Sequence, residues 1–139
     1  MKAAKYRKAP SGLGRPWAVA FAFAALIGCG AGDGGSTDIE SGDMRLTVQL
    51  ASVVVGQNRM MIEVADLAGA MIEGVGLAVD PQMATHGHGS TEVPLVSERG
   101  GGHYEAFPVT FQMPGAWEIT VSATAGALSA KKTIHVTVR

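Results

Sequence analysis

From Met44 onward, hydrophobic residues recur at every second position of the chain. In RLTVQLA, residues 45–51, Leu46, Val48 and Leu50 alternate with polar residues. The run AWEITVSATA, residues 116–125, alternates in the same way. Because successive side chains of a strand point to opposite faces, this period of two predicts β-strands with one buried face rather than helices.

Seven runs of this kind follow one another, separated by segments that contain glycine or proline. Proline cannot donate a ladder hydrogen bond, so Pro94 favours an edge position for the fourth run and Pro108 predicts a bulge or bend in the fifth. Short strands at a spacing of about ten residues are typical of an immunoglobulin-like sandwich. We therefore predict an all-β fold, a seven-stranded immunoglobulin-like β-sandwich. The predicted strands are residues 45–51, 59–66, 75–80, 91–97, 102–111, 116–125 and 128–139.

Large side chains in these runs are expected to form the core. Tyr104 and Trp117 are predicted to be inward anchors that pack near one another, with the tyrosine hydroxyl bonded to a backbone acceptor. In the last run we expect Leu128 to point inward. Lys132 interrupts that buried face, and its stem is expected to extend along the edge toward solvent.

The first 28 residues have the composition of an export signal. A basic leader without acidic residues ends at Arg15, and the apolar run WAVAFAFAALI, residues 17–27, follows it. A membrane-spanning helix needs about 20 apolar residues, so this run is too short for a permanent anchor. The run ends in LIGC, residues 26–29, which resembles the bacterial lipobox. We therefore predict a lipoprotein signal at residues 1–28 and acylation of Cys29.

The segment after this cysteine is predicted to be a tether. Residues 30–42, GAGDGGSTDIESG, hold a single large aliphatic residue, a composition that behaves as a flexible coil. An acylated Cys29 and a tether at residues 29–43 would hold the domain at residues 44–139 beside a membrane. We expect a location in the cell envelope. In Gram-negative lipoproteins a residue other than Asp after the cysteine, here Gly30, favours the outer membrane facing the periplasm.

The charge and the cysteine content of the chain limit its possible partners and metal ligands. Beyond Cys29 the chain carries six basic and twelve acidic residues, a formal net charge of −6. We therefore expect no nucleic-acid partner. Cys29 is the only cysteine, so no internal disulfide can form. A soft metal ligand in the predicted domain would have to be methionine.

The stretch MATHGHGS, residues 83–90, is the strongest candidate for chemistry. His86 and His88 are two apart, so in an extended segment their rings point the same way and can share one ion. Met83 adds a thioether. Imidazole suits copper and zinc, and thioether suits Cu(I), so copper is the favoured ion.

Further ligands could come from His103 and Met113, if the fold brings them to the same place. Zinc stays open, although a structural zinc site normally has four ligands. The alternative is a solvated, glycine-loosened loop whose histidines bind nothing. No other cofactor is expected.

The segment GHYEAFPVTFQMPGAWEITVSA, residues 102–123, resembles the YtkA-like domain family, to which the FixH proteins are related. The resemblance rests on a Gly-x-Tyr pattern followed by Met-Pro-Gly-x-Trp and an alternating strand. It extends over roughly residues 44–139. The residues that carry it are Gly102, Tyr104, Met113, Pro114, Gly115 and Trp117.

The resemblance also bears on the histidine loop. Members of the family often carry Met-Pro-x-Met-x-His after the third strand. Here Pro81 and Met83 match, Asp80 replaces the first methionine, and the histidines begin one residue late at His86. FixH proteins have a membrane helix and are associated with assembly of a copper-containing oxidase. This chain has a predicted lipid anchor instead, so that role is not carried over.

No enzyme class is expected, because the chain has no Gly-x-Ser-x-Gly, no His-Glu-x-x-His and no phosphate-binding glycine loop before a helix. We predict a lipid-anchored envelope protein that binds or handles a metal ion, copper first. The alternative is an adaptor without metal, which offers an edge strand or a loop face to another envelope protein.

Overall fold

The structure is a computed structural model that describes residues 39–139. The predicted signal, Cys29 and most of the predicted tether lie outside the described residues. In residues 39–139, strands joined by turns and loops make up the fold, and no helix forms. Its strands are β1 (Ile39–Gly42), β2 (Met44–Leu50), β3 (Gly56–Asp66), β4 (Gly76–Met83), β5 (His88–Gly89), β6 (Leu95–Gly100), β7 (His103–Phe111), β8 (Gly115–Ala125) and β9 (Leu128–Val138).

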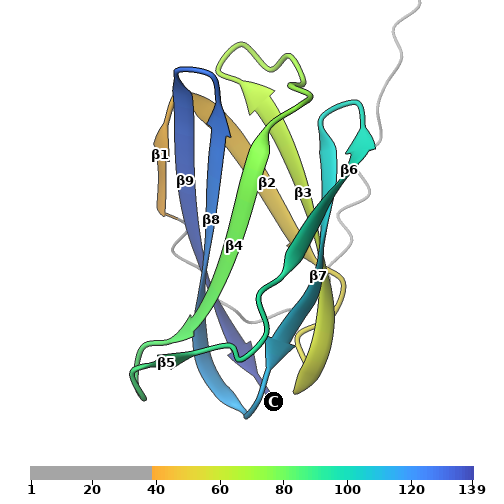
Figure 1. Cartoon of the computed structure of the whole chain (residues 1–139). Coiled ribbons are helices and arrows are strands. Elements are labelled where there is room, and N and C mark those ends of the chain that lie inside the picture. The colour runs from red at the N-terminus through yellow and green to blue at the C-terminus, as the bar shows by residue number, and fades with distance from the viewer. Residues whose placement is uncertain (1–38) are drawn as a thin grey trace, which may run out of the picture. The chain divides into compact units, whose positions relative to one another are not determined.

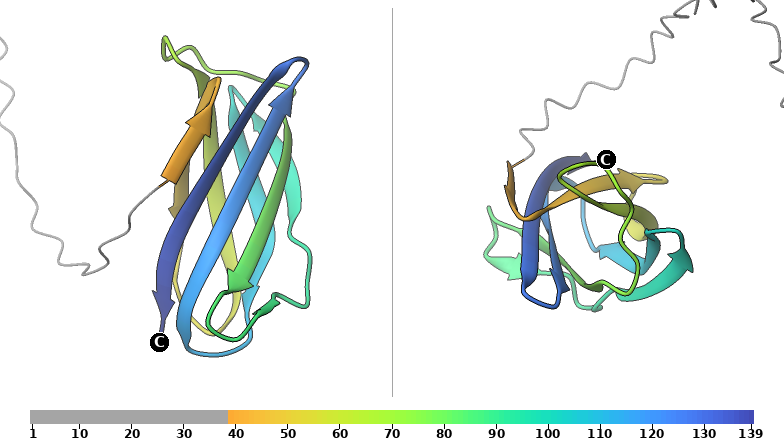
Figure 2. Two further views of the ribbon diagram at one scale, coloured as in Figure 1. Left: turned by 90° about the vertical axis from the view of Figure 1, so that its left-hand side faces the viewer. Right: turned by 90° about the horizontal axis from the view of Figure 1, so that it is seen from above.

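The strands form two antiparallel sheets that face each other (Figure 1). One sheet has the order β1-β9-β8-β4-β5, and the other has the order β2-β3-β7-β6. Figure 2 shows the two layers from the side and from above, with the long strands running between the two ends. The predicted all-β sandwich of two antiparallel sheets is confirmed.

The predicted number of strands was wrong: the structure has nine strands in residues 39–139, whereas the sequence pattern predicts seven. The additional strands are the shortest ones. β1 falls inside the predicted tether and pairs with β9 from Ile39 opposite Thr133 to Gly42 opposite Ala130. β5 falls in the histidine loop and pairs with the end of β4. Neither segment is long enough to show an alternating pattern.

The interior comes from the alternating positions. The inward residues of β3 and β8, such as Ile62 and Ile119, are fully buried. Leu128 was predicted to point inward, but it is exposed at the start of β9. The Lys132 ammonium donates to the Leu46 carbonyl at 3.0 Å, so its side chain reaches the edge strand β2. A lysine at this position protects a sheet edge against further pairing.

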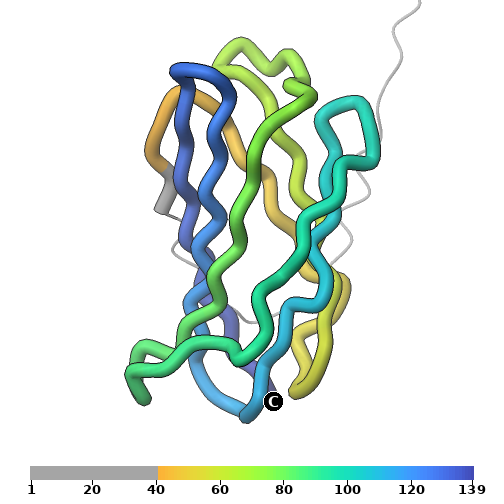
Figure 3. Tube along the Cα trace, in the orientation of Figure 1, coloured from red at the N-terminus to blue at the C-terminus, as the bar shows by residue number. Residues whose placement is uncertain are grey.

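Both prolines act as predicted. Pro94 lies directly before β6, which is an edge strand of the four-stranded sheet. Opposite Arg59 the β3–β7 pairing shifts, because the partner changes from Val109 to Ala106, and Pro108 lies in the extra length of β7. Figure 3 follows the resulting path of the chain between the two ends of the sandwich.

Candidate metal site at one end of the sandwich

A tight turn between β4 and β5 carries the two histidines. The amides of His86 and Gly87 both donate to the Met83 carbonyl, at 3.1 and 3.0 Å. Gly87 has a φ of 66°, the left-handed conformation that glycine adopts without strain. Met83 and His88 then stand opposite each other in the short ladder. The turn is therefore an ordered hairpin rather than an open loop.

The hairpin brings the two imidazoles together at the surface. The ring centroids of His86 and His88 are 5.9 Å apart, with the ring planes tilted by 47°. A metal bound at about 2 Å from an imidazole nitrogen lies about 3 Å from the ring centroid, so two rings on one ion are separated by about 5 to 6 Å. The observed centroid spacing lies within this range.

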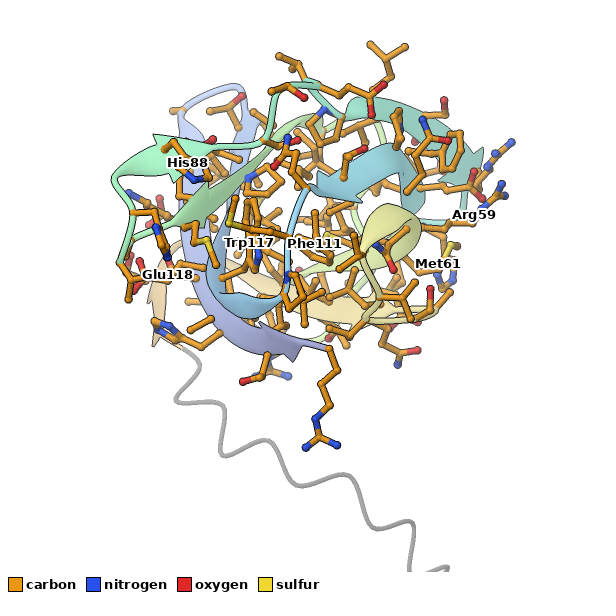
Figure 4. The ribbon with its side chains drawn as sticks, turned by 90° about the horizontal axis from the view of Figure 1, so that it is seen from below. Arg59, Met61, His88, Phe111, Trp117 and Glu118 are labelled. Carbon is orange, nitrogen blue, oxygen red and sulfur yellow. The ribbon has the colours of Figure 1, made fainter. Side chains whose placement is uncertain are left out.

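His88 rests against the aromatic end of the core. Its ring meets Trp117 edge to face, with the centroids 6.3 Å apart. Trp117 in turn packs on Phe111, with 5.2 Å between the ring centroids. Figure 4 looks at this end of the sandwich and shows His88 beside Trp117, with Phe111 next to it. The core aromatic residues thus support one wall of the candidate site.

The expected pair of Trp117 and Tyr104 does not form. The indole of Trp117 donates to the Met113 carbonyl at 3.1 Å. The hydroxyl of Tyr104 donates to the Ile72 carbonyl at 3.1 Å, which confirms its predicted backbone acceptor. It also accepts from the Val75 amide at 3.0 Å, near the start of β4. The two anchors serve opposite ends of the sandwich, and Phe111 takes the place beside Trp117.

The two methionines of the predicted ligand set lie at the same end. Met83 is directly opposite His88, and directly opposite residues of antiparallel strands project on the same face. Its side chain is only 2% exposed, so it lies beneath the histidine and within the core. Met113 lies in the β7–β8 loop, is 36% exposed, and is tied to Trp117 through its carbonyl.

His103 is not part of this group. It begins β7 at the opposite end of the sandwich, as the places of β5 and of the β6–β7 hairpin in Figure 1 show. There its Nδ1 lies 3.6 Å from a carboxylate oxygen of Glu63. His135 projects from β9, and its Nδ1 is 3.5 Å from Glu118. Of the histidines in residues 39–139, only His86 and His88 come together.

A complete cage is absent from the described residues. Within residues 39–139, no three side chains of His, Cys, Asp or Glu gather in a way that could hold a metal ion. The arrangement therefore brings two imidazoles together at the surface, on a hairpin whose buried Met83 is paired with His88.

One feature of this end was missed in the sequence. The β2–β3 loop, residues 51–55, presents successive valines, and Val54 and Val55 are 49% and 44% exposed. The buried Asn58 side chain holds this loop, because its oxygen accepts from the Val54 amide and its nitrogen donates to the Val54 carbonyl at 2.8 Å. In the sequence, the only signal of this exposed loop is a run of three valines before a glycine, which does not by itself distinguish a loop from a strand.

Residues 39–139 contain no helix of the length and hydrophobicity that crossing a bilayer requires.

Comparisons with curated proteins and with solved structures found no match. The model of the YtkA-like family matches residues 38–122, which include β1 to β7 and most of β8. The match covers more than half of the chain and contains both histidines of the candidate site. The chain therefore belongs to the YtkA-like family.

Proposed function

We propose that this protein is a lipid-anchored protein of the cell envelope that binds copper through His86 and His88. The observation that carries the proposal is the pairing of two exposed imidazoles, 5.9 Å apart, on one ordered hairpin. Two exposed histidines in a free loop would have no fixed separation. Here the hydrogen bonds to the Met83 carbonyl hold the backbone between them.

The surroundings favour copper over harder ions. Met83 lies opposite His88 on the same face, and the ring of His88 contacts the indole of Trp117. A thioether and aromatic surface suit Cu(I), whereas Mg²⁺ and Ca²⁺ favour carboxylate ligands, which residues 83–88 do not contain. Met83 is paired with His88, and Met113 accepts a hydrogen bond from Trp117, which contacts His88.

The proposed location at a membrane rests on the predicted acylation of Cys29. Acylation of Cys29 would place the domain at the surface of a membrane, with the segment before β1 as the connection. A copper-binding domain held there would meet ions in an exported compartment, where thiols are scarce and methionine and histidine serve as ligands. The outer membrane, facing the periplasm, is the proposed site in a Gram-negative cell.

An adaptor role is the second candidate, and a separate surface favours it. Val93 and Leu95 are 81% and 73% exposed, at the start of the edge strand β6. Phe107, which pairs with Leu95, is 40% exposed. A protein that bound these residues would require neither His86 nor His88.

A competition titration with Cu(I) tests the proposal. The full chain with Cys29→Ser, which removes the only thiol, is titrated in detergent against a colorimetric Cu(I) chelator. We expect copper to be withdrawn from the chelator and the His86→Ala/His88→Ala variant to lose at least tenfold in affinity. The matched control is His103→Ala/His135→Ala, which removes the same number of imidazoles and should bind as the parent does. Equal binding by both double variants would refute the proposal and favour the adaptor.

A further inference from the structure

We propose that the outer face of the four-stranded sheet lies on the surface of the membrane that holds this chain. This inference rests on the lipid anchor of the proposed function and does not involve copper. The outer face consists of the outward positions of β2, β3, β7 and β6. It carries exposed apolar side chains beside arginines, and the chain between Cys29 and β1 is short enough to keep it near the bilayer.

Large apolar side chains project from the outer face. Val93 and Leu95, at 81% and 73%, are the two most exposed large hydrophobic residues in the part of the chain that the structure describes. Phe107 pairs with Leu95, and Met61 projects from β3 nearby. Figure 4 shows Met61 on this side of the sandwich and Glu118 on the other. The outward positions of β8 and β9 in the five-stranded sheet are instead mainly polar: Glu118, Thr120, Ser122, Thr124, Lys131, Thr133, His135 and Thr137.

Arginines lie beside these apolar side chains. Arg59 and Arg99 are 51% and 52% exposed, whereas Glu105, which both of them bind, is only 13% exposed. The network therefore presents guanidinium groups outward, where they can donate to lipid phosphates. Half of the six basic residues beyond Cys29, but only a quarter of the twelve acidic ones, lie on the outer face or are bonded to it: Arg45, Arg59 and Arg99, against Glu63, Glu92 and Glu105. The outer face is thus neutral in an acidic chain.

The length of the connection to the anchor fits this arrangement. Cys29 and Ile39 are ten residues apart, so the chain between them spans at most about 35 Å. Ile39 begins β1 in the five-stranded sheet, and packed sheets lie about 10 Å apart. When the outer face rests on the bilayer, β1 therefore stays within reach of an acylated Cys29. Contact with the bilayer is then intramolecular and takes place at a high effective concentration.

The edge of the outer face argues against an added protein strand as the occupant. Pro94 precedes β6, and the pairing with β7 shifts directly after Glu98. Glu98 lies opposite the buried Tyr104, on the inward side of this edge strand. A proline, a bulge and an inward charge all hinder pairing at a sheet edge. Side chains as exposed as Val93 and Leu95 can instead insert among lipid headgroups.

A nitroxide label on the outer face tests this inference in vesicles of phosphatidylethanolamine and phosphatidylglycerol. Ser97→Cys places the label on the outer face, and Thr137→Cys places it at an exposed outward position of the opposite sheet. In the mature acylated chain the sulfur of Cys29 is blocked by lipid, so each variant takes one label. Compared with the label at residue 137, we expect the label at residue 97 to collide at least threefold more with oxygen, which dissolves in lipid. It should collide at least threefold less with a water-soluble nickel chelate.

Two double variants test which side chains hold the face on lipid. Val93→Glu/Leu95→Glu replaces the two most exposed apolar groups, so the label at residue 97 should return to water. The matched control is Leu67→Glu/Leu128→Glu, which replaces two exposed leucines outside the outer face and should leave the label in lipid. Equal effects of the two double variants would overturn the inference.

The remaining outcomes separate this inference from the proposed function. Equal collision of both labels with the nickel chelate would overturn the inference, because the domain would then stand clear of the bilayer, and would leave the outer face to an adaptor role. Low collision of the label at residue 97 with both oxygen and the chelate would also overturn it and would indicate contact with a second copy. A second label on each chain would show that Cys29 carries no lipid, which would overturn both this inference and the proposed anchor. Copper binding by His86 and His88 is independent of all these outcomes.

Discussion

Asn58 shows how one buried polar residue can hold a surface loop in place. It is 2% exposed, and its side-chain nitrogen donates to the carbonyls of Val54, Gly56 and Val109. Its oxygen accepts from Ser52 Oγ at 2.9 Å. A buried amide that is bonded in this way stabilises the fold, and the same bonds turn the valines of the loop outward.

Replacing Asn58 should therefore cost stability and loosen the loop together. We expect Asn58→Ala to lower the free energy of unfolding by about 2 to 3 kcal/mol, because several backbone groups lose their partner at once. Urea unfolding measures this difference. Gln57→Ala is the control, since the neighbouring side chain is exposed and makes only a long bond to Glu92 at 3.4 Å. Equal losses in the two variants would contradict the role assigned to Asn58.

The contact between His88 and Trp117 could not be predicted from the sequence. The types of residue in the histidine hairpin predict a metal site, which stays a prediction. The i, i+2 spacing predicted neighbouring rings in an extended segment, and the rings do lie close, although His86 lies in a turn. The contact of His88 with Trp117 depends on the pairing of β4 with both β5 and β8. Trp117 was placed only as a structural anchor, because pairing between distant segments leaves no local signal in a single sequence.

At the scale of elements, an ion-pair network crosses the outer face of the four-stranded sheet. Glu105 on β7 lies 2.8 Å from Arg99 on β6 and 3.1 Å from Arg59 on β3. The guanidinium of Arg59 also lies over the ring of Phe107, 5.2 Å from its centroid. The hydrogen bond from Arg99, with added attraction from Arg59, lowers the pKa of Glu105 below its ordinary value of 4.5. The network thus joins three neighbouring strands.

This pKa shift predicts a pH dependence of stability. Since the folded pKa lies below the unfolded value, the ionised carboxylate stabilises the fold above about pH 4.5, and the effect is lost as the pH falls through the folded pKa. The stability difference between the parent and Glu105→Gln should therefore shrink as the pH is lowered into that range. Urea unfolding at several pH values measures it. In an Arg99→Met background the dependence should be weaker, and an unchanged dependence would refute the assignment to Arg99.

Long elements could be predicted from the sequence, and short ones could not. β2, β3, β8 and β9 alternate over enough residues to reveal both their existence and their buried face. β1 has the sequence IESG, whose glycine and serine favour a coil. Its position is set by pairing with β9, which approaches so closely that a Cβ at Gly42 would overlap the backbone of Ser129 and Ala130. The glycine is therefore required by the contact between the two strands. Contacts of this kind come from the fold and not from local preference.

At the scale of the whole molecule, the two ends of the sandwich differ in chemistry. One end carries His86 and His88 beside Trp117. The other end carries the Tyr104 hydroxyl network, in which Glu98 accepts from the Gly74 amide at 3.0 Å. The distance between the ends explains why His103 cannot join the candidate site. The predicted ligand set of His86, His88, Met83, His103 and Met113 is therefore reduced to its members at one end.

The central claim is that His86 and His88 bind one copper ion together. Nuclear magnetic resonance of the imidazole nitrogens tests it most directly, in the full chain with Cys29→Ser and ¹⁵N-labelled histidine. The chain has four histidines, so each can be assigned from its alanine variant. Substoichiometric Cu(I) should shift the ring nitrogens of His86 and His88 together and leave those of His103 and His135 in place. Shifts at only one of the two, equal shifts at all four histidines, or no shift would contradict the claim.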